Sequence, residues 1–424
     1  MKKITALFLL LCLIFPFAAC ENLGDALGVG TSSVSGTDTS ILGTGLPSDY
    51  KKLLSGKKVL EVRISIEESD YAALMGVPSA DTYYPATVNI DGAVSTTAGI
   101  KIKGNTDYVD EANGERYSFK LKFDKYMKGS KLLGLDELCL NNAIYDPSFV
   151  REFLTYKLLA EIGGNAPLAS FAAVYVNDSY VGLYTAVEAI DNSYLDRVFG
   201  GHSGELYKAN RGCTLQKDEV LNMEMKKGSD ASGYSAVAAM IDALAGEGNI
   251  ADAVNVSSVL KYIAANAVIA NTDSYLGKKA QNFYFYNQNG KLQMIPWDYN
   301  LAFGTDTSLR KTEYAIDKSL ISADVTNPYF NTLPESRPLI SALLEDETYY
   351  AEYLSYIKTL FAYLDTIAEE LTAYRDMIKD YVESDTTKFY TYNDFLSEFD
   401  GENPNSLAYF INARNEAIKA QIAE

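Results

Sequence analysis

The spacing of hydrophobic residues divides the chain into a strand-rich first part and a mainly helical second part. Between residues 58 and 122, short runs such as KKVLEVRISI and RYSFKLKF alternate apolar and polar residues. A period of two is typical of half-buried β-strands. In the second run it places Phe119 and Leu121 on one face of a strand and Lys120 and Lys122 on the other. Two further apolar runs, FAAVYVND and SYVGLYTAVEAID, predict a pair of central strands.

Helical spacing first appears between these strands and dominates later. Residues 146–163 predict one helix, with Asp146 as its cap, Pro147 in its first turn and Gly163 at its end. An exception within the helical second part is a hairpin at 282–298, whose two strand-like runs flank the turn Gln288-Asn289-Gly290. Further helices are predicted at 231–245, 257–271, 335–345, 346–383 (with a break allowed) and 405–423.

These elements predict an α+β protein with two lobes. A chain of 424 residues is too long for one simple core. We expect a strand-rich N-lobe with one helix at about 58–190 and a mainly helical C-lobe at about 191–424. Both lobes belong to a domain predicted to span residues 48–424.

Composition removes several classes of function. Lys and Arg number 37 against 56 Asp and Glu, a formal net charge of −19, which opposes nucleic-acid binding. The single histidine, His202, lies in a Gly-rich stretch and is expected to be a loop residue. Multiple-histidine zinc sites are therefore excluded, and any nucleophile–histidine system would depend on this one residue. Any chemistry must use Asp, Glu, Asn and Lys.

The N-terminus predicts export and a lipid anchor. Residues 1–20 combine Lys2 and Lys3, a short apolar run and Phe-Ala-Ala-Cys, which resembles a bacterial lipobox ending at Cys20. The alternative is an ordinary signal peptide with an incidental cysteine. Residues 21–47 are rich in Gly, Ser and Thr and are expected to form a flexible tether with a reach of about 30 Å. The protein would then be a membrane-anchored lipoprotein at the cell envelope, touching the membrane only through its lipid.

Six motifs occur in an order that resembles the CotH-like proteins, the spore-coat-protein-H kinase family. They are GIKIKGN, YSFKLKFDKY, DPSFVREFLTYKL, YVGLYTAVEAID, the long block NTDSYLGKKAQNFYFYNQNGKLQMIPWDYNLAFG, and RPLI. The resemblance runs from about Val59 to the C-terminus. It implies an atypical protein-kinase fold that transfers phosphate from ATP to Ser or Thr and uses a divalent metal, Mg²⁺ or Mn²⁺.

The long block also carries residues suited to phosphoryl transfer, which needs a base near the acceptor, ligands for metal, and a cation on the phosphates. Asp273, Asn282 and Asp298 follow one another as the base, first ligand and second ligand do in kinases. We expect Asp273 to be catalytic. Because a hairpin brings the far ends of its strands together, Asn282 and Asp298 are expected to share one cation through hard oxygen atoms.

The phosphate-binding cation is expected on the strand that ends at Lys122. Lys120 and Lys122 share one face, and Glu152 lies near the start of the following helix, which mimics the lysine–glutamate pair of kinases. Lys120 is the favoured candidate, and Lys122 and Arg116 are alternatives. For either lysine alone, a solvated strand face is an alternative interpretation.

Two more segments are expected to contact the nucleotide. Lys103-Gly104-Asn105 ends a strand and could cover the phosphates in place of a longer Gly-rich loop. Glu188 and Asp191 follow the fifth expected strand, where a hinge would meet adenine or ribose. Together with Lys120, Lys122 and Glu152, the residues Lys103, Asn105 and Glu188 form the expected nucleotide-binding set.

The acidic residues also have structural interpretations. Asp298 could accept backbone hydrogen bonds at a turn, Asp273 could cap the turn after its helix, and Asn282 could bond strand edges only. Two positions depart from the resemblance. Gln281 stands where many relatives have His, and the loop LGKKAQ carries two lysines where relatives more often have Gly and Asn.

The favoured function is an exported kinase that acts on Ser or Thr of a surface or coat protein. The acidic chain suits an acceptor rich in Lys and Arg. The main alternative is a non-catalytic cell-surface binding or adhesion module on a kinase-like scaffold, and a third is transfer of AMP. Retention of Asp273, Asn282 and Asp298 favours the catalytic hypotheses, since a binding module need not keep all three.

Overall fold

The computed structural model describes residues 49–104, 116–229, 233–306 and 314–423. Cys20, the expected tether and Asn105 lie outside these ranges. Within them, no helix combines the length and the apolar character needed to cross a membrane.

The first part of the domain is a closed sheet of seven strands with the neighbour order β1-β2-β3-β4-β5-β7-β6. Alternate side chains point into it, so Phe119 and Leu121 are buried inside while Lys120 and Lys122 face outward, as predicted. The strands are β1 (Val59–Ser65), β2 (Tyr84–Ile90), β3 (Ala93–Lys103), β4 (Ser118–Lys122), β5 (Glu137–Asn141), β6 (Ala169–Val176) and β7 (Ser179–Glu188).

The second part surrounds a four-stranded sheet with the order β11-β10-β8-β9. The predicted hairpin forms its β10 (Phe283–Gln288) and β11 (Lys291–Pro296), which pair in register around Asn289-Gly290. β8 (Leu206–Ala209) and β9 (Met223–Lys227) complete it and were not predicted. The helices after β7 are α4 (Asn192–Phe199), α5 (Ser235–Leu244), α6 (Ile250–Ala253), α7 (Val256–Val268), α8 (Pro338–Leu344), α9 (Glu347–Ser384), α10 (Tyr392–Ser397) and α11 (Leu407–Ile422).

The mixed α+β class is confirmed, and each predicted helix has an observed counterpart, with shifts at the ends. α9 runs without a break through the region where one was allowed. The first part contains two helices besides the predicted one, α1 (Tyr50–Leu53) and α2 (Glu68–Gly76). Both cysteines in the described ranges, Cys139 and Cys213, are buried free thiols.

The predicted helix at 146–163 begins later than expected, at Arg151, and is α3 (Arg151–Glu161). Phe149 has a φ of +60°, which cannot continue a right-handed helix. The carboxylate of Asp146 instead accepts hydrogen bonds from the backbone nitrogens of Ser148, at 3.0 Å, and Arg151, at 2.8 Å. Asp146 therefore supports the helix start from a loop five residues earlier.

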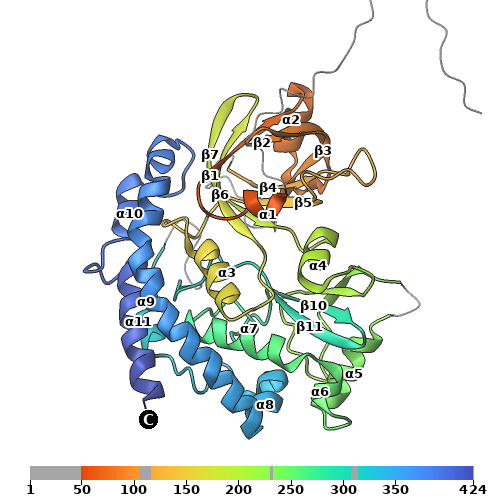
Figure 1. The fold of residues 1–424 in the computed structure, drawn as a ribbon, viewed down its shortest axis with the longest axis vertical. Helices are drawn as coiled ribbons and strands as arrows, with labels where there is room; N and C mark the ends of the chain where they lie inside the picture. The colour runs from red at the N-terminus through yellow and green to blue at the C-terminus, as the bar shows by residue number, and fades with distance from the viewer. Residues whose placement is uncertain (1–48, 105–115, 230–232, 307–313, 424) are drawn as a thin grey trace, which may run out of the picture. The chain divides into compact units, whose positions relative to one another are not determined.

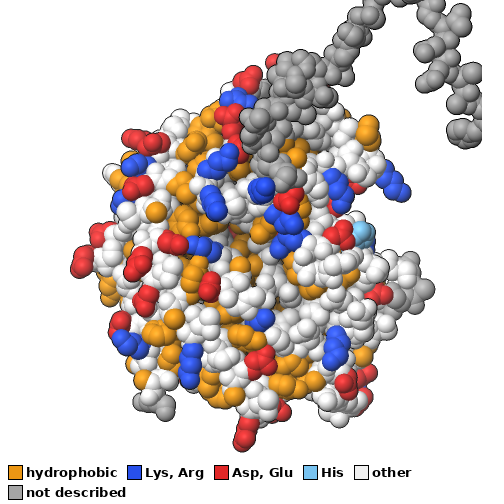
Figure 2. Space-filling view, in the orientation of Figure 1, with side chains coloured by type: hydrophobic (Ala, Val, Ile, Leu, Met, Phe, Trp, Pro, Cys, Tyr) orange, Lys and Arg blue, Asp and Glu red, His pale blue; other side chains and the backbone are white. Residues whose placement is uncertain are grey.

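α3 lies between the closed sheet and the long helix α9, and it packs on α7 as well (Figure 1). Two hydrophobic clusters meet around it. One fills the closed sheet, and the other joins α3 to the helices and sheet of the second part. On the face drawn in Figure 2, acidic and basic side chains are interspersed with apolar ones, so the acidic excess is spread out there.

A buried ion pair ties the end of α9 to the closed sheet. The Arg116 guanidinium lies 2.7 Å from the Asp385 carboxylate, and both side chains are almost wholly excluded from solvent. Asp385 also accepts the backbone N–H of Leu183 on β7 at 3.1 Å. Arg116, an alternative phosphate-binding cation in the sequence, is therefore structural. Gly182 lies against this pair, and a Cβ on it would collide with Arg116 Nη1.

We predict that Gly182→Ala destabilises the domain by about 3–5 kcal/mol, because it opens a buried ion pair and forces a side chain into a backbone with φ of +127°. Urea unfolding checks this. Gly201→Ala is the matched control, since an added Cβ there meets nothing within 4 Å. Equal stability of the two variants would contradict the prediction.

Candidate active site

A cavity of about 410 Å³ opens between the closed sheet, α3 and the β10–β11 hairpin. Its charged and amide side chains come from five separate segments of the chain, so no single motif builds it. Those used below are Lys103, Asn141, Glu152, Asp273, Lys279 and Asp298. The structure thus brings the predicted catalytic residue, one predicted metal ligand and two predicted nucleotide contacts into one space.

Lys103 reaches Glu152 through an amide. Lys103 ends β3, and its Nζ lies 2.6 Å from Oδ1 of Asn141 at the end of β5. The Asn141 amide donates in turn to Glu152 Oε2 at 2.7 Å. A strand lysine therefore does connect to the helix glutamate, but the lysine is Lys103 and not Lys120. Lys103 had been expected only as part of a phosphate-covering loop.

Lys120 and Lys122 form ion pairs elsewhere. Both bind Glu137 on the neighbouring strand β5, Lys122 at 2.6 Å. Burial alone would lower the pKa of Lys120, but the nearby Glu137 carboxylate outweighs that effect. The pKa of Lys120 therefore lies above the usual lysine range. Because β3 pairs with β4 in the register Lys103↔Ser118 and Lys101↔Lys120, the two lysines share the outer face with Lys103 but lie further along it. The predicted Lys120–Glu152 pair is wrong.

These lysines line a second cavity of about 330 Å³ together with Asp191. One Asp191 oxygen caps α4 by accepting the backbone N–H of Ser193 at 3.0 Å, and its buried Oδ2 has no hydrogen-bond partner within the described ranges. Burial and the carboxylate of Glu137 raise the pKa of Asp191 to about 7. Asp191 thus lines this cavity with one unpartnered oxygen, at the position where a hinge was predicted.

Glu188 is not available to a nucleotide, contrary to expectation. Its side chain is wholly buried. It forms an ion pair with Arg197 and accepts hydrogen bonds from Tyr50 Oη at 2.8 Å and from the backbone N–H of Leu168 at 3.0 Å. These partners use both of its oxygens, so Glu188 is a structural carboxylate that joins β7 to α1 and α4.

Asp273 occupies a short loop after α7. Its backbone N–H donates to the side chain of Asn271 at 3.0 Å, so Asn271 and not Asp273 stabilises the turn. The Asp273 carboxylate accepts three side-chain hydrogen bonds, from Lys279 at 2.6 Å, Gln281 at 3.0 Å and Asn282 at 2.9 Å. Burial raises its pKa above the usual range, and Lys279 acts in the opposite direction. The carboxylate is held toward the cavity by side chains, as a catalytic group requires.

Asn282 and Asp298 lie at the open end of the hairpin, as predicted. The pairing Phe283↔Pro296 places Asn282 beside the residue before Asp298. The Asn282 amide nitrogen bonds both the carbonyl and the carboxylate of Asp273, at 2.8 and 2.9 Å. Its side-chain oxygen accepts no hydrogen bond from the part of the chain that the structure describes. Asn282 has a φ of +63° and Asp298 of +61°, so both are held in a backbone region that is costly for their side chains.

The donor set at the hairpin end fits a hard divalent cation. Within ranges 49–104, 116–229, 233–306 and 314–423, the Asp298 carboxylate accepts no hydrogen bond, although its backbone N–H donates to Tyr156 Oη at 3.1 Å. The same ranges hold no group of three or more His, Cys, Asp or Glu side chains arranged for a metal. One carboxylate and one amide oxygen are suited to Mg²⁺, which commonly takes its remaining ligands from water and substrate phosphates.

Trp297 packs beside this end of the hairpin. Its ring meets Tyr284 edge to face at a centroid distance of 5.9 Å. Lys103 Nζ lies 5.4 Å from the centre of the Trp297 ring, within cation–π range. Trp297 therefore supports both the hairpin and the lysine that reaches over it.

Sequence reasoning missed Asn141 and Tyr156, and it noted Lys279 only as a departure from relatives. Tyr156 lies four residues after Glu152 on α3, donates its hydroxyl proton to Glu152 Oε1 at 3.1 Å, and accepts the Asp298 N–H. The i, i+4 spacing on a helix is a signal that could have identified Tyr156. Asn141 ends a strand, and nothing local indicated that its side chain would join two charged groups.

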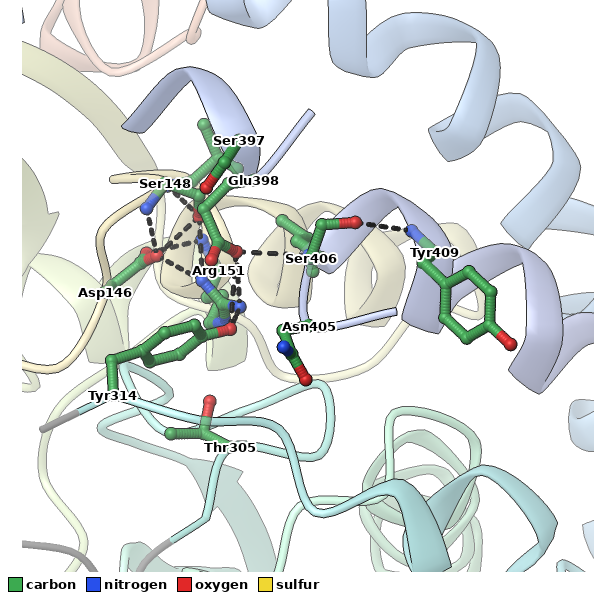
Figure 3. Close-up of polar contacts among 12 residues, drawn as sticks. Asp146, Ser148, Arg151, Thr305, Tyr314, Ser397, Glu398, Asn405, Ser406 and Tyr409 are labelled. Carbon is green, nitrogen blue, oxygen red and sulfur yellow. Dashed lines mark hydrogen bonds and ion pairs between the residues drawn. The ribbon is translucent and has the colours of Figure 1, made fainter. Parts of the chain in front are cut away.

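A buried guanidinium next to Glu152 fixes the position of α3. Arg151 forms ion pairs with Asp146 at 2.6 Å and with Glu398 at 2.8 Å, and its side chain has no solvent exposure. Figure 3 shows these carboxylates and the hydroxyl of Tyr314 converging on the guanidinium. The cluster joins α3 to the end of α10, so it sets where the neighbouring Glu152 points.

Glu152 is expected to make stability depend on pH. Burial and the nearby Asp298 carboxylate raise its pKa from 4.5 to about 7. The folded state then holds a proton that the unfolded state releases, so this stabilising contribution is present below about pH 4.5 and is lost as pH rises through 7. We predict that wild-type protein loses about 2 kcal/mol relative to Glu152→Gln between pH 5 and pH 7.

Urea unfolding of the metal-free and nucleotide-free protein at the two pH values measures this difference. Glu161→Gln, at the exposed end of the same helix, is the control and should follow the wild type. Parallel stability of wild type and Glu152→Gln at both pH values would refute the prediction.

The comparisons with known proteins concern the family of this chain. The profile of the family described as CotH kinase protein matches residues 100–418. Inner spore coat protein H of Bacillus subtilis (strain 168) is 23% identical over 308 residues, which cover 68% of this chain and 79% of that protein. A solved complex of HipA, HipB and operator DNA from Shewanella oneidensis MR-1 matches with a TM-score of 0.35 and 14% identity, over 68% of this chain and 58% of that chain. This last likeness is too low to support an argument. Because the family profile covers most of the chain, the protein belongs to the CotH kinase family.

Proposed function

We propose that the protein is an exported atypical protein kinase with a bilobal fold that transfers the γ-phosphoryl group of ATP to Ser or Thr of a surface or coat protein. The observation that carries this proposal is the convergence of Lys103, Glu152, Asp273 and Asp298 on one cavity. These are the groups that phosphoryl transfer requires: a cation for phosphates, its carboxylate partner, a group that orients the acceptor, and a metal ligand.

In this mechanism the nucleotide lies along the outer face of the closed sheet. Its phosphates would meet Lys103, which Asn141 and Glu152 hold in place, while its base or ribose would lie toward Asp191 in the second cavity. Asn282 and Asp298 would hold Mg²⁺ or Mn²⁺ through their free oxygens, and the metal would neutralise the phosphates. The donor chemistry supports this placement.

Asp273 would orient the acceptor hydroxyl and receive its proton. The acceptor oxygen forms a bond to the γ-phosphorus, the bond from that phosphorus to the β–γ bridging oxygen breaks, and ADP leaves. The side-chain donors around Asp273 keep its carboxylate fixed in the cavity, so the geometry favours an orienting role over strong basicity. Because the Asp273 carboxylate is already oriented, it does not have to change conformation during the transfer step, and this raises the rate.

The acceptor is proposed to be rich in Lys and Arg around its Ser or Thr. A net charge of −19 would attract such segments, and the rate should fall as salt screens the attraction. The B. subtilis relative is named as an inner spore coat protein, which supports a coat or surface protein as the substrate.

We predict that Asp273→Asn retains binding of ATP with Mg²⁺ but lowers phosphoryl transfer roughly 10²–10⁴-fold, because only the orientation of the acceptor is lost. The assay would incubate the full chain with labelled ATP, Mg²⁺ or Mn²⁺, and a basic Ser-rich protein, and would also follow autophosphorylation and AMP transfer.

Asp298→Asn is the contrasting variant. It should fold but lose most of the Mg²⁺-dependent thermal stabilisation by ATP.

Three other outcomes would change the assignment. Transfer that survives Asp273→Asn would place the orienting group elsewhere. Binding of ATP without transfer of phosphate or AMP to any acceptor would favour the binding-module hypothesis. An equal thermal shift in wild type and Asp298→Asn would make Asp298 a structural residue.

The location is proposed to be the cell envelope, with the chain anchored by lipid at Cys20. Cys20→Ala should release the protein from the membrane fraction or leave it unprocessed, because acylation needs the thiol. Cys12→Ala is the matched control, since Cys12 lies within the apolar run and should leave anchoring unchanged. Fractionation with mass analysis of the mature N-terminus measures both, and unchanged membrane fractionation of Cys20→Ala together with a mature N-terminus elsewhere would exclude the anchor.

A further inference from the structure

Described side chains fill three of the four lone-pair positions of the Asp273 carboxylate before any acceptor hydroxyl arrives. Its Oδ1 accepts hydrogen bonds from Lys279 at 2.6 Å and Gln281 at 3.0 Å, and its Oδ2 accepts one from Asn282 at 2.9 Å. A carboxylate oxygen has two lone-pair positions, so both positions of Oδ1 are taken. Asp273 is only 5% exposed. An acceptor hydroxyl that approaches Oδ1 must therefore displace a donor.

Lys279 is the donor that can leave most easily. Asn282 is fixed by its second hydrogen bond to the Asp273 carbonyl, at 2.8 Å, and Gln281 lies two residues before strand β10. The ammonium group of Lys279 has no other hydrogen bond or ion pair among residues with described positions. Its side chain is 22% exposed and ends a flexible four-carbon stem.

The backbone around Lys279 cannot follow the side chain. The Lys279 carbonyl accepts the N–H of Gly212 at 2.7 Å, and the next carbonyl, of Ala280, accepts the N–H of Cys213 at 3.0 Å. Two residues earlier, the carbonyl of Gly277 accepts a hydrogen bond from the buried guanidinium of Arg337. With the loop held from both sides, displacement of Lys279 moves only its side chain.

The displaced ammonium group remains in the cavity, since Lys279 lines it together with Lys103 and Asp298. Lys103 is already bound to Asn141, and the proposed metal lies at the hairpin end. The phosphoryl group in transfer passes between Asp273 and these groups. A mobile cation that starts 2.6 Å from Asp273 is therefore close to the charge that develops on that phosphoryl group.

We propose that Lys279 is a further catalytic residue: it occupies Asp273 in the free enzyme, and its ammonium group moves to the γ-phosphate when the acceptor hydroxyl takes its place. This inference rests on the proposed kinase function. The acceptor proton passes to Asp273, the acceptor oxygen bonds the γ-phosphorus, and ADP departs with the electrons of the broken bond.

Binding experiments separate this role from simple neutralisation of Asp273. Calorimetry on the full chain with Mg²⁺ and the basic Ser-rich acceptor protein would compare ADP with the non-hydrolysable β,γ-imido analogue of ATP. The Lys279→Met variant lacks one charge-assisted hydrogen bond to the γ-phosphate. It should therefore bind the analogue roughly 10- to 100-fold more weakly than wild type and bind ADP equally well. Lys279→Arg should recover part of the loss. Lys278→Met is the matched control, because its exposed side chain does not line the cavity.

Kinetics give a second readout. Lys279→Met should lower kcat for transfer and also lower KM for the acceptor, since the hydroxyl no longer has to displace an ammonium group. Thermal unfolding of Lys279→Met and Lys278→Met verifies that both variants fold. Equal binding of the analogue by wild type and Lys279→Met, or an equal loss for analogue and ADP, would overturn the role of Lys279.

The outcomes also distinguish this inference from the kinase proposal. One outcome is that Lys279→Met weakens binding of the analogue and not of ADP while no acceptor is phosphorylated. In that case Lys279 contacts the γ-phosphate and the transfer proposal fails. If transfer occurs and Lys279→Met behaves as Lys278→Met does, the kinase proposal stands and the Lys279 role fails. If wild-type protein binds neither nucleotide, both fail.

Discussion

The site depends on a guanidinium that has no contact with water. Arg151 begins α3, where a positive charge opposes the helix dipole, so it requires compensation. Asp146 and Glu398 supply it, from the loop before α3 and from the end of α10. Removing one partner of such a buried pair would leave a charge that the interior cannot solvate, so the loss of either carboxylate would strongly destabilise the fold. Because Glu152 is the next residue, the same contacts that hold Arg151 aim Glu152 at the cavity.

The carboxylates of the cavity differ in their hydrogen-bond partners. Glu152 is bound by Asn141 and Tyr156, and Asp273 by Lys279, Gln281 and Asn282, whereas the Asp298 carboxylate accepts no hydrogen bond from any described residue. Burial raises the pKa of Glu152, and the nearby Asp298 carboxylate raises it further. The least satisfied carboxylate is therefore at the position best placed for a cation.

Two buried tyrosines connect the carboxylates of the cavity to the core. Tyr156 joins Glu152 to the backbone of Asp298, and its ring meets Tyr299 edge to face at a centroid distance of 5.6 Å. Tyr299 accepts a hydrogen bond from Asn266 at 3.0 Å, and Asn266 in turn accepts one from Asn271, which holds the Asp273 backbone. Such fully bonded polar chains in a low-dielectric interior favour one arrangement, so the active groups are positioned by the core and not by the surface.

The sequence by itself determined the α+β class, the strand faces, the hairpin, and the order Asp273, Asn282, Asp298. These follow from local rules: side-chain periodicity, turn residues and the meeting of strand ends. The start of α3 was missed because a side chain, that of Asp146, set it from outside the helix. Only the tertiary structure decided which lysine reaches Glu152. Lys103, Lys120 and Lys122 share one outward face, and strand register with the intervening Asn141 selects Lys103. Glu188 was likewise misjudged because Arg197 and Tyr50 bury it. Local patterns state which face a side chain occupies, but its partner depends on segments distant in the sequence that pack against that face.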